Sequence, residues 1–218
     1  VDTALRRCDT VAGYSHYVDF IRDRIAGKPV IQNGMKGEVE RCLSALEAAL
    51  AGQNVCMVCS GDPGILAMAG LLYELRTREP RFRDIPIRVL PGITAATIAA
   101  ASLGAPLQNG FSLVSLSDLL VSADEVRRNI RSVAQSLLPV ALYNPAGRKR
   151  RALLEETLAV FREHRGRDVL CAYVKNAGRE QETKWVGKLS EFPAAEVDMS
   201  TLIIIGGPRT RLDSGVLY

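Results

Sequence analysis

The sequence predicts an α/β fold made of two α/β domains with a cleft between them, the second containing a mixed sheet. Strand and helix patterns alternate through residues 10–103, which is typical of layered α/β domains with a largely parallel sheet. The segment GAPLQNG (104–110) has the composition of a linker, so we expect domains over residues 1–106 and 107–218. Three strand patterns near the end follow one another without a long helix between them, which favours an antiparallel part in the second sheet.

The elements of the first domain follow from apolar spacing and from turn residues. Short apolar runs predict strands over 10–13, 30–31, 54–59 and 87–90. Helices are expected from Ser15 to Gly27, over 39–50, through Leu71 to Leu75, and over 95–103. In the second of these helices the apolar residues share one face, and Gly52 stands where a C-terminal cap belongs.

The second domain is expected to contain more strands than helices. The predicted strands are 111–115, 139–143, 169–174, 183–189 and 201–206. Ser122 and Glu125 have the spacing of a capping box, so they should open a helix. A second, basic helix is expected from Arg148 to about His164.

The composition is that of an ordinary globular protein. The 218 residues carry 28 Lys and Arg against 24 Asp and Glu, so the formal net charge is 28 − 24 = +4, with 47% hydrophobic and 24% charged residues. These values exclude a disordered tail and a coiled coil. No apolar stretch is long enough for a membrane span, and no secretory signal opens the chain, so we expect a soluble, cytoplasmic protein without a membrane partner. The excess charge is too small and too scattered to indicate nucleic-acid binding.

The cysteines and histidines do not form a metal or hydrolase motif. Five cysteines indicate a reducing compartment rather than a disulfide framework. Cys56 and Cys59 lie three residues apart on a predicted strand, where they point to opposite faces and cannot share a metal, so we interpret them as core residues. Zinc-protease, nucleophile-elbow, P-loop and dinucleotide-binding patterns are absent from the sequence, and no protein-bound metal is expected.

Three loops that contain Gly or Pro come directly after predicted strands. They are Ser60–Gly64 (SGDPG), Pro91–Thr94 (PGIT) and Asn144–Gly147 (NPAG). Ligands of open α/β sheets bind beyond the carboxyl ends of strands, and glycine there lets the backbone approach a ligand closely. Asp62 or Thr94 could hydrogen-bond such a ligand. Each loop alone would also be compatible with an ordinary turn.

The order and spacing of several segments resemble the tetrapyrrole methylase family. These segments are CSGDPGILAMAGLLYE, VLPGITAATIAAASLGAPL, FSLVSLSDLL, ALYNPAGRKRR and NAGREQET. Within that family they look like the precorrin-3B or cobalt-factor III C-17 methyltransferases of cobalamin biosynthesis. SLSDLL, and LYNP followed by a basic run, are the more specific of these features. The resemblance covers nearly the whole chain.

The resemblance implies S-adenosylmethionine as the methyl donor, bound between the two domains of a homodimer, and a tetrapyrrole at the precorrin-3 level as the acceptor. Residues that match donor-contacting positions of the family are Ser60, Gly61, Asp62, Ile65, Thr94, Ala95, Leu142, Tyr143, Asn144 and Ala177. Ser117 and Asp118 follow a predicted strand directly, so they could hydrogen-bond the acceptor or move a proton, or else form a turn before Ser122. We name these two as the catalytic candidates.

A sulfonium donor is already activated, so methyl transfer needs alignment more than a strong acid or base, which suits a sequence poor in histidine. Lys36, Arg127, Arg128 and the basic run 148–151 offer charges complementary to a carboxylate-rich macrocycle. Two alternatives stay open. One is a sibling methylase that acts at another ring position, on ribosomal RNA or on a modified protein histidine, and the other is a non-catalytic donor- or tetrapyrrole-binding module.

The sequence departs from the family pattern in three places. The family begins with a strand and a GxGPG loop that precede the segment at residue 1, so we expect such a segment upstream. Val121-Ser122-Ala123 stands where Pro-Trp is frequent, and Asn109-Gly110-Phe111 stands where His-Asp-Phe is common. The last two changes concern the acceptor more than the donor.

Overall fold

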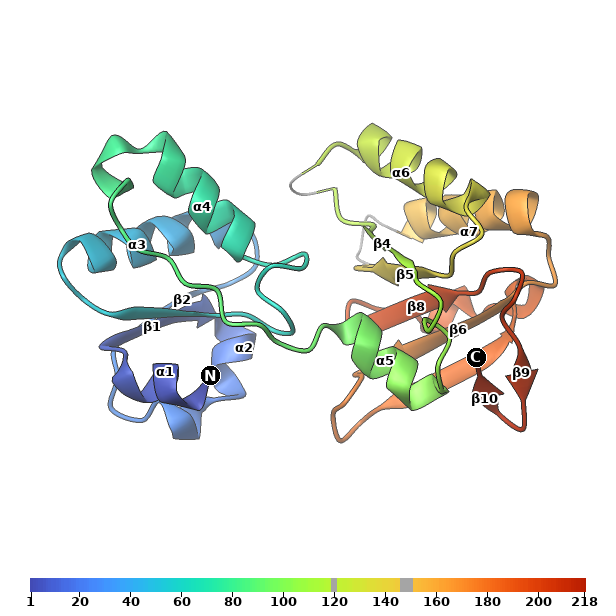
Figure 1. Ribbon diagram of the computed structural model, residues 1–218, viewed down its shortest axis with the longest axis horizontal. Coiled ribbons are helices and arrows are strands. Elements are labelled where there is room, and N and C mark those ends of the chain that lie inside the picture. Colours follow the sequence, from blue (N-terminus) through green and yellow to red (C-terminus); the bar gives the residue numbers. More distant parts are fainter. Residues whose placement is uncertain (119–120, 146–150) are drawn as a thin grey trace. The chain divides into compact units, whose positions relative to one another are not determined.

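The computed structural model describes residues 1–118, 121–145 and 151–218, which form two compact units (Figure 1). Unit 1 is Val1–Thr94 and unit 2 is Ala95–Tyr218. The division lies twelve residues before the expected boundary at 106/107. The reason is the helix α5 (Ala95–Leu103), whose Ala96, Ala99 and Leu103 pack against the sheet of unit 2. The segment 104–110 therefore connects elements within unit 2.

Unit 1 contains a parallel three-stranded sheet in the order β2-β1-β3. The strands are β1 (Thr10–Tyr14), β2 (Val30–Asn33) and β3 (Val55–Val58). Val11 lies opposite Val30 on one side and Cys56 on the other. Because all three strands run in the same direction, the loops that follow them leave from one edge of the sheet.

Helices cover both faces of this sheet, as the expected alternation of strands and helices predicts (Figure 1). On one face lie α1 (Asp2–Arg7) and α2 (Ser15–Asp19), and on the other lie α3 (Glu38–Leu50) and α4 (Ala69–Arg78). The expected helix from Ser15 to Gly27 is wrong in its second half. The chain tightens into a 3-10 turn over Arg22–Arg24, which brings Ile25 into the core at 4% exposure.

The expected strand over 87–90 is also wrong, because these residues pair with no neighbouring strand among those described. Side chains of α4 donate hydrogen bonds to backbone carbonyl groups in this region instead. The Tyr73 hydroxyl donates to the Ile87 carbonyl at 3.3 Å, and Arg76 Nη1 donates to the Ile85 carbonyl at 3.2 Å. A 3-10 helix over Pro80–Phe82 precedes this segment and buries Phe82.

Unit 2 contains a five-stranded mixed sheet in the order β4-β5-β8-β6-β7, as expected. The strands are β4 (Ser112–Ser115), β5 (Val140–Tyr143), β6 (Leu170–Lys175), β7 (Thr183–Lys188) and β8 (Thr201–Ile205). β4 and β5 are parallel, and β8 is antiparallel to both β5 and β6. β4, β5 and β6 therefore all end at the same edge of the sheet.

Successive residues of these strands pack on opposite faces, as a pleated sheet requires. Leu142, Tyr173 and Ile203 face α6 (Ala123–Gln135) and α7 (Arg151–Arg165). Ala141, Ala172 and Ile204 belong to the cluster that contains α5. The predicted N-cap is confirmed, since the Ser122 hydroxyl accepts from the Glu125 N–H at 3.2 Å. The first three residues of the expected basic helix, 148–150, lie outside the described residues.

The last part of the chain forms two further strands that the sequence did not predict. β9 (Leu212–Asp213) and β10 (Val216–Leu217) pair as a short hairpin. The Leu217 carbonyl accepts from the Ala105 N–H at 2.9 Å, which ties this hairpin to the segment after α5. Between β7 and β8 lie 3-10 turns over Leu189–Glu191 and Ala194–Glu196. Strands of two residues are too short to show a periodic pattern.

Asp198, just before β8, should make unit 2 acid-sensitive. Its Oδ1 accepts from the Ser200 N–H at 2.9 Å, and its carboxylate pairs with Lys175. Burial raises the pKa of Asp198, but Lys175, Ser200 and Thr201 outweigh that effect and lower the pKa to about 2. A carboxyl whose folded pKa is depressed stabilises the fold above its unfolded pKa of about 4, and loses this contribution as the pH falls towards 2.

We therefore expect Asp198→Asn to lower the free energy of unfolding by about 1 kcal/mol at pH 6, a value that allows for solvent screening of a partly exposed pair. The difference from the unsubstituted chain should shrink to nearly zero at pH 2. Urea unfolding followed by fluorescence of Trp185, the sole tryptophan of the chain, reports on unit 2. A difference that stays constant with pH would contradict this role of Asp198.

Candidate functional site

Asp62 joins two of the three loops identified from the sequence. Its Oδ1 accepts from the Gly64 N–H at 2.8 Å, within the SGDPG loop. Its Oδ2 accepts from the Gly92 N–H at 3.0 Å, in the PGIT loop. One carboxylate thus fixes the loop that follows β3 to a loop that is thirty residues further along the chain.

Gly92 permits this junction because it has no side chain. A Cβ atom built on Gly92 would lie 2.1 Å from the Gly61 carbonyl oxygen and 3.0 Å from the Gly61 carbonyl carbon. Gly61 itself has φ +76°, a left-handed conformation that favours glycine. Both glycines are therefore required by geometry.

The joined loops present exposed backbone and apolar groups. Ser60 and Gly61 are exposed, Ile65 is 38% exposed and Ile93 is 67% exposed. The Ile65 N–H closes a turn by donating to the Asp62 carbonyl at 3.1 Å, whereas Thr94 is buried. A ligand could therefore contact main-chain groups and apolar side chains on these loops.

In unit 2, the Ser115 hydroxyl accepts two hydrogen bonds at the carboxyl ends of β4 and β5. Its hydroxyl oxygen accepts from the Ser117 N–H at 3.1 Å and from Asn144 Nδ2 at 3.0 Å. Asn144 has φ +52°, in the left-handed region that asparagine tolerates better than most residues. Such conformations concentrate at functional sites, where surrounding contacts hold them.

Tyr143 connects β5 to α5. Its hydroxyl oxygen accepts from the Ala96 N–H at 2.7 Å, which satisfies one of the donors at the start of the helix that Ala95 begins. Leu142 is fully buried in the core, so only its backbone could contact a ligand. Ala177 follows β6 and packs against the apolar cluster that contains α5.

The catalytic candidates lie immediately after β4. Ser117 is half-buried and its N–H is held by Ser115, whereas the Asp118 side chain is exposed. Residues 119–120, the rest of the SLSDLL segment, lie outside the described residues. Asp118 thus lies three residues after Ser115, the last residue of β4, and the Ser115 hydroxyl also binds Asn144, the residue after β5.

The basic residues expected to face a carboxylate-rich acceptor differ in their surroundings. Arg127 Nε donates to Glu156 Oε1 at 2.9 Å and Arg127 Nη1 donates to Asp124 Oδ1 at 3.0 Å. The hydrogen bonds from Arg127 to Glu156 and Asp124 raise its pKa, so its charge is already matched within unit 2. Lys36 and Arg128 are exposed, and Arg151 Nη2 donates to the Ala195 carbonyl at 3.4 Å.

The cysteines behave as packing residues. All five are unpaired, and burial raises the pKa of the Cys42 and Cys171 thiols to about 12. In the described ranges no group of three or more His, Cys, Asp or Glu could hold a metal ion. Over the same residues, no helix is both long and apolar enough to cross a membrane.

Curated relatives match nearly the whole chain. A probable cobalt-factor III C(17)-methyltransferase of Salmonella typhimurium is 36% identical over 214 residues, which are 98% of this chain and 88% of the relative. A precorrin-3B C(17)-methyltransferase of Sinorhizobium sp is 35% identical over 201 residues, which are 92% of this chain and 79% of that protein.

Solved structures agree with this likeness. The crystal structure of the methyltransferase CobJ matches with a TM-score of 0.94 and 32% identity, covering 99% of this chain and 90% of that one. Uroporphyrin-III C-methyl transferase of Thermus thermophilus, solved with S-adenyl homocysteine, has a TM-score of 0.67 over 94% of this chain and 88% of that one. At 20% identity it supports the fold alone.

The two α/β units, with glycine-bearing loops at the carboxyl ends of their strands, define a ligand-binding α/β protein. The model of the tetrapyrrole (corrin/porphyrin) methylases matches residues 1–193, so the chain belongs to this family and is a methyltransferase. The resemblance drawn from the loop motifs is thereby confirmed.

Three features of the structure were not foreseen from the sequence. They are the junction of Asp62 with Gly92, the left-handed Asn144 with its bond to Ser115, and the buried Arg41. A glycine or an asparagine in a loop is common, so the sequence only weakly indicates that it bonds to a second loop or strand end. An arginine within an amphipathic helix gives no sequence signal that it is buried.

Proposed function

We propose that this chain transfers a methyl group from S-adenosylmethionine to C-17 of precorrin-3B or of cobalt-factor III, with contraction of the ring, in cobalamin biosynthesis. The observation that carries the proposal is the 36% identity to a probable cobalt-factor III C(17)-methyltransferase over 98% of this chain. The similarity to a precorrin-3B enzyme supports the same ring position for either acceptor.

We propose donor contacts on the joined loops of unit 1 and, separately, at the strand ends of unit 2. Exposed glycine backbone at Gly61 leaves room for a nucleoside, and Asp62 preorganises the loop through two hydrogen bonds. We propose that Ser60, Ile65 and Thr94 complete the donor contacts of unit 1, and that Ala95, the first residue of unit 2, is a further donor contact. The other proposed donor contacts of unit 2 are Tyr143, Asn144, Ala177 and the backbone of Leu142.

The donor supplies an activated methyl group, so the protein's part is to align the acceptor carbon with it and to exclude water. Ser117 and Asp118 are the proposed acceptor-side groups. Their place beside the fixed Ser115 suits a hydrogen bond to the macrocycle or the movement of a proton at the Asp118 carboxylate.

Asp118→Asn should therefore slow methyl transfer to the acceptor without weakening donor binding. We expect the affinity for S-adenosylhomocysteine to stay within about twofold, while kcat falls by about tenfold to a hundredfold, the range that a positioned acid or base contributes. Ser112→Ala, at the other end of β4, serves as the matched control and should change neither quantity. An Asp118→Asn variant with unchanged kcat would remove Asp118 from the acceptor side.

We also propose that the enzyme is a cytoplasmic homodimer without resident metal, nucleic-acid or membrane partners. The family resemblance supports this, and light scattering of the purified chain at micromolar concentration is the direct check. A monomer under these conditions would contradict the dimer.

The acceptor can be identified by mass spectrometry after incubation of the full-length protein with S-adenosylmethionine and either precorrin-3B or its cobalt form. We expect one of these acceptors to gain a single methyl group. If the chain binds S-adenosylmethionine tightly but methylates neither acceptor, a sibling activity or a non-catalytic binding role replaces the proposed one.

A further inference from the structure

Arg41 is a buried cation with unused hydrogen-bonding capacity. It lies in the first turn of α3 and is only 3% exposed. Its Nη1 donates to the side-chain and backbone oxygens of Asn33. Its Nε is buried and has no hydrogen-bond partner among the residues that the structure describes. Buried donors without a partner are rare in folded proteins, so this one calls for a physical explanation.

In the described ranges, no acidic side chain neutralises this guanidinium. Within the described residues Arg41 forms no ion pair. The two glutamates nearest in sequence have other partners: Glu38 accepts from the Lys36 N–H at 3.3 Å, and Glu40 accepts from Asn33 Nδ2 at 3.4 Å. A buried charge without a counter-charge is costly, and a fold retains it only when something offsets the cost.

The guanidinium lies at the edge of the unit 1 sheet that carries the SGDPG loop. Asn33, its hydrogen-bond partner, is the last residue of β2, and the Asn33 carbonyl also accepts from the Ser15 hydroxyl just after β1. A further neighbour is Cys59, the residue before the SGDPG loop. Burial raises the pKa of Cys59, and the positive charge of Arg41 opposes this shift, which is a sign of their proximity.

From these observations we propose that Arg41 binds a carboxylate group of a ligand at the carboxyl edge of the β2-β1-β3 sheet. A guanidinium holds a carboxylate with two parallel hydrogen bonds, a geometry that a lysine ammonium cannot reproduce. The inference rests on the proposed function, because both of its substrates carry carboxylates. One source is the amino-acid end of the methyl donor, and the other is a side chain of the tetrapyrrole.

The test is Arg41→Met, which keeps a long, flexible side chain and removes the charge. Calorimetry with S-adenosylmethionine and with decarboxylated S-adenosylmethionine measures the donor arm. If the donor carboxylate is the ligand, the affinity for the intact donor should fall by at least about tenfold, the scale of a lost charged pair, while that for the decarboxylated donor should not change. If the tetrapyrrole carboxylate is the ligand, both donor affinities should persist and the KM for the acceptor should rise by about tenfold.

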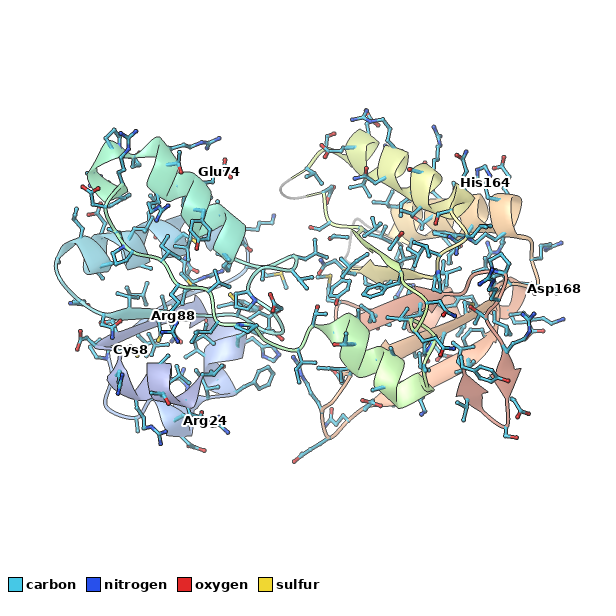
Figure 2. The ribbon with its side chains drawn as sticks, viewed as in Figure 1. Cys8, Arg24, Glu74, Arg88, His164 and Asp168 are labelled. Carbon is cyan, nitrogen blue, oxygen red and sulfur yellow. The ribbon has the colours of Figure 1, made fainter. Side chains whose placement is uncertain are left out.

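Two further variants separate ligand binding from a structural role. Arg24→Met removes an arginine of unit 1 (Figure 2). Its side chain is 63% exposed and pairs with Asp2, so the substitution should leave every binding parameter unchanged. Arg41→Lys keeps the charge and should recover only part of the affinity. The thermal midpoint of ligand-free Arg41→Met should stay close to that of the unsubstituted chain, since the variant removes an unpaired buried charge.

The proposal is overturned if Arg41→Met leaves the donor affinities and the acceptor KM unchanged. It is equally overturned if the intact and the decarboxylated donors lose affinity to the same extent. Failure of the unsubstituted chain to bind S-adenosylmethionine at all would instead count against the proposed function, so the two failures are distinguishable.

Discussion

Gly92→Val is expected to weaken S-adenosylhomocysteine binding by at least about a hundredfold, which corresponds to about 2.7 kcal/mol. The Cβ atom of any larger residue would lie 2.1 Å from the Gly61 carbonyl oxygen, so the backbone of one loop must move. That movement also breaks the 3.0 Å bond from the Gly92 N–H to Asp62. Calorimetry on the folded variant measures the effect directly.

Gly70→Ala is the matched control for this experiment. Gly70 lies in the first turn of α4, where an added Cβ atom meets nothing within 4 Å, so donor affinity should not change. Asp62→Asn provides a milder variant, because it keeps one acceptor oxygen and leaves the loops sterically unstrained. A Gly92→Val protein that binds the donor like the unsubstituted chain would exclude the paired loops from the site.

Arg165→Met should lower the free energy of unfolding of unit 2 by about 3 kcal/mol, the scale of several lost charge-assisted hydrogen bonds net of relaxation. The Arg165 guanidinium donates to the carbonyls of Val133, Ala134 and Ser136 at the end of α6, at 2.6, 3.1 and 2.9 Å. A further bond of 2.8 Å reaches the Gly206 carbonyl beyond β8. One side chain therefore caps α6 and ties it to the sheet.

Burial lowers the pKa of Arg165 to about 10, which still leaves it charged at neutral pH. Urea unfolding followed by Trp185 fluorescence measures the loss in unit 2. Arg167→Met, at an exposed position two residues further along, should cost less than about 0.5 kcal/mol. If both variants unfold at the same urea concentration, Arg165 does not stabilise unit 2 by tying α6 to the sheet.

The layered α/β architecture was predictable because it rests on local apolar spacing and on the order of the elements. The mixed sheet of unit 2 followed from three strand patterns without a long helix between them, and the Ser122 cap followed from its spacing to Glu125. The position of α5 was not predictable in this way. Its small apolar residues suit either unit, and only packing against Ala172 and Ile204 assigns it to unit 2.

The strand expected over 87–90 illustrates a second limit of the sequence. Its residues have β propensity, but a strand exists only where a neighbouring backbone completes the ladder of hydrogen bonds, which is a tertiary condition. The same holds for the site. SGDPG and PGIT indicate ligand-binding loops, whereas the bond from Gly92 to Asp62 depends on where the chain returns. Likewise, the sequence offers Arg127 as a charge for the acceptor, but only the fold shows that Glu156 lies beside it.

Methylation at C-17 is tested by the position of the new methyl group in the product. Full-length protein is incubated with S-adenosylmethionine carrying a carbon-13 methyl group and with the tetrapyrrole acceptor, and the isolated product is analysed by NMR. We expect the labelled methyl signal to couple to C-17 of a contracted ring. A labelled methyl group on any other ring carbon would rule out the proposed C-17 activity.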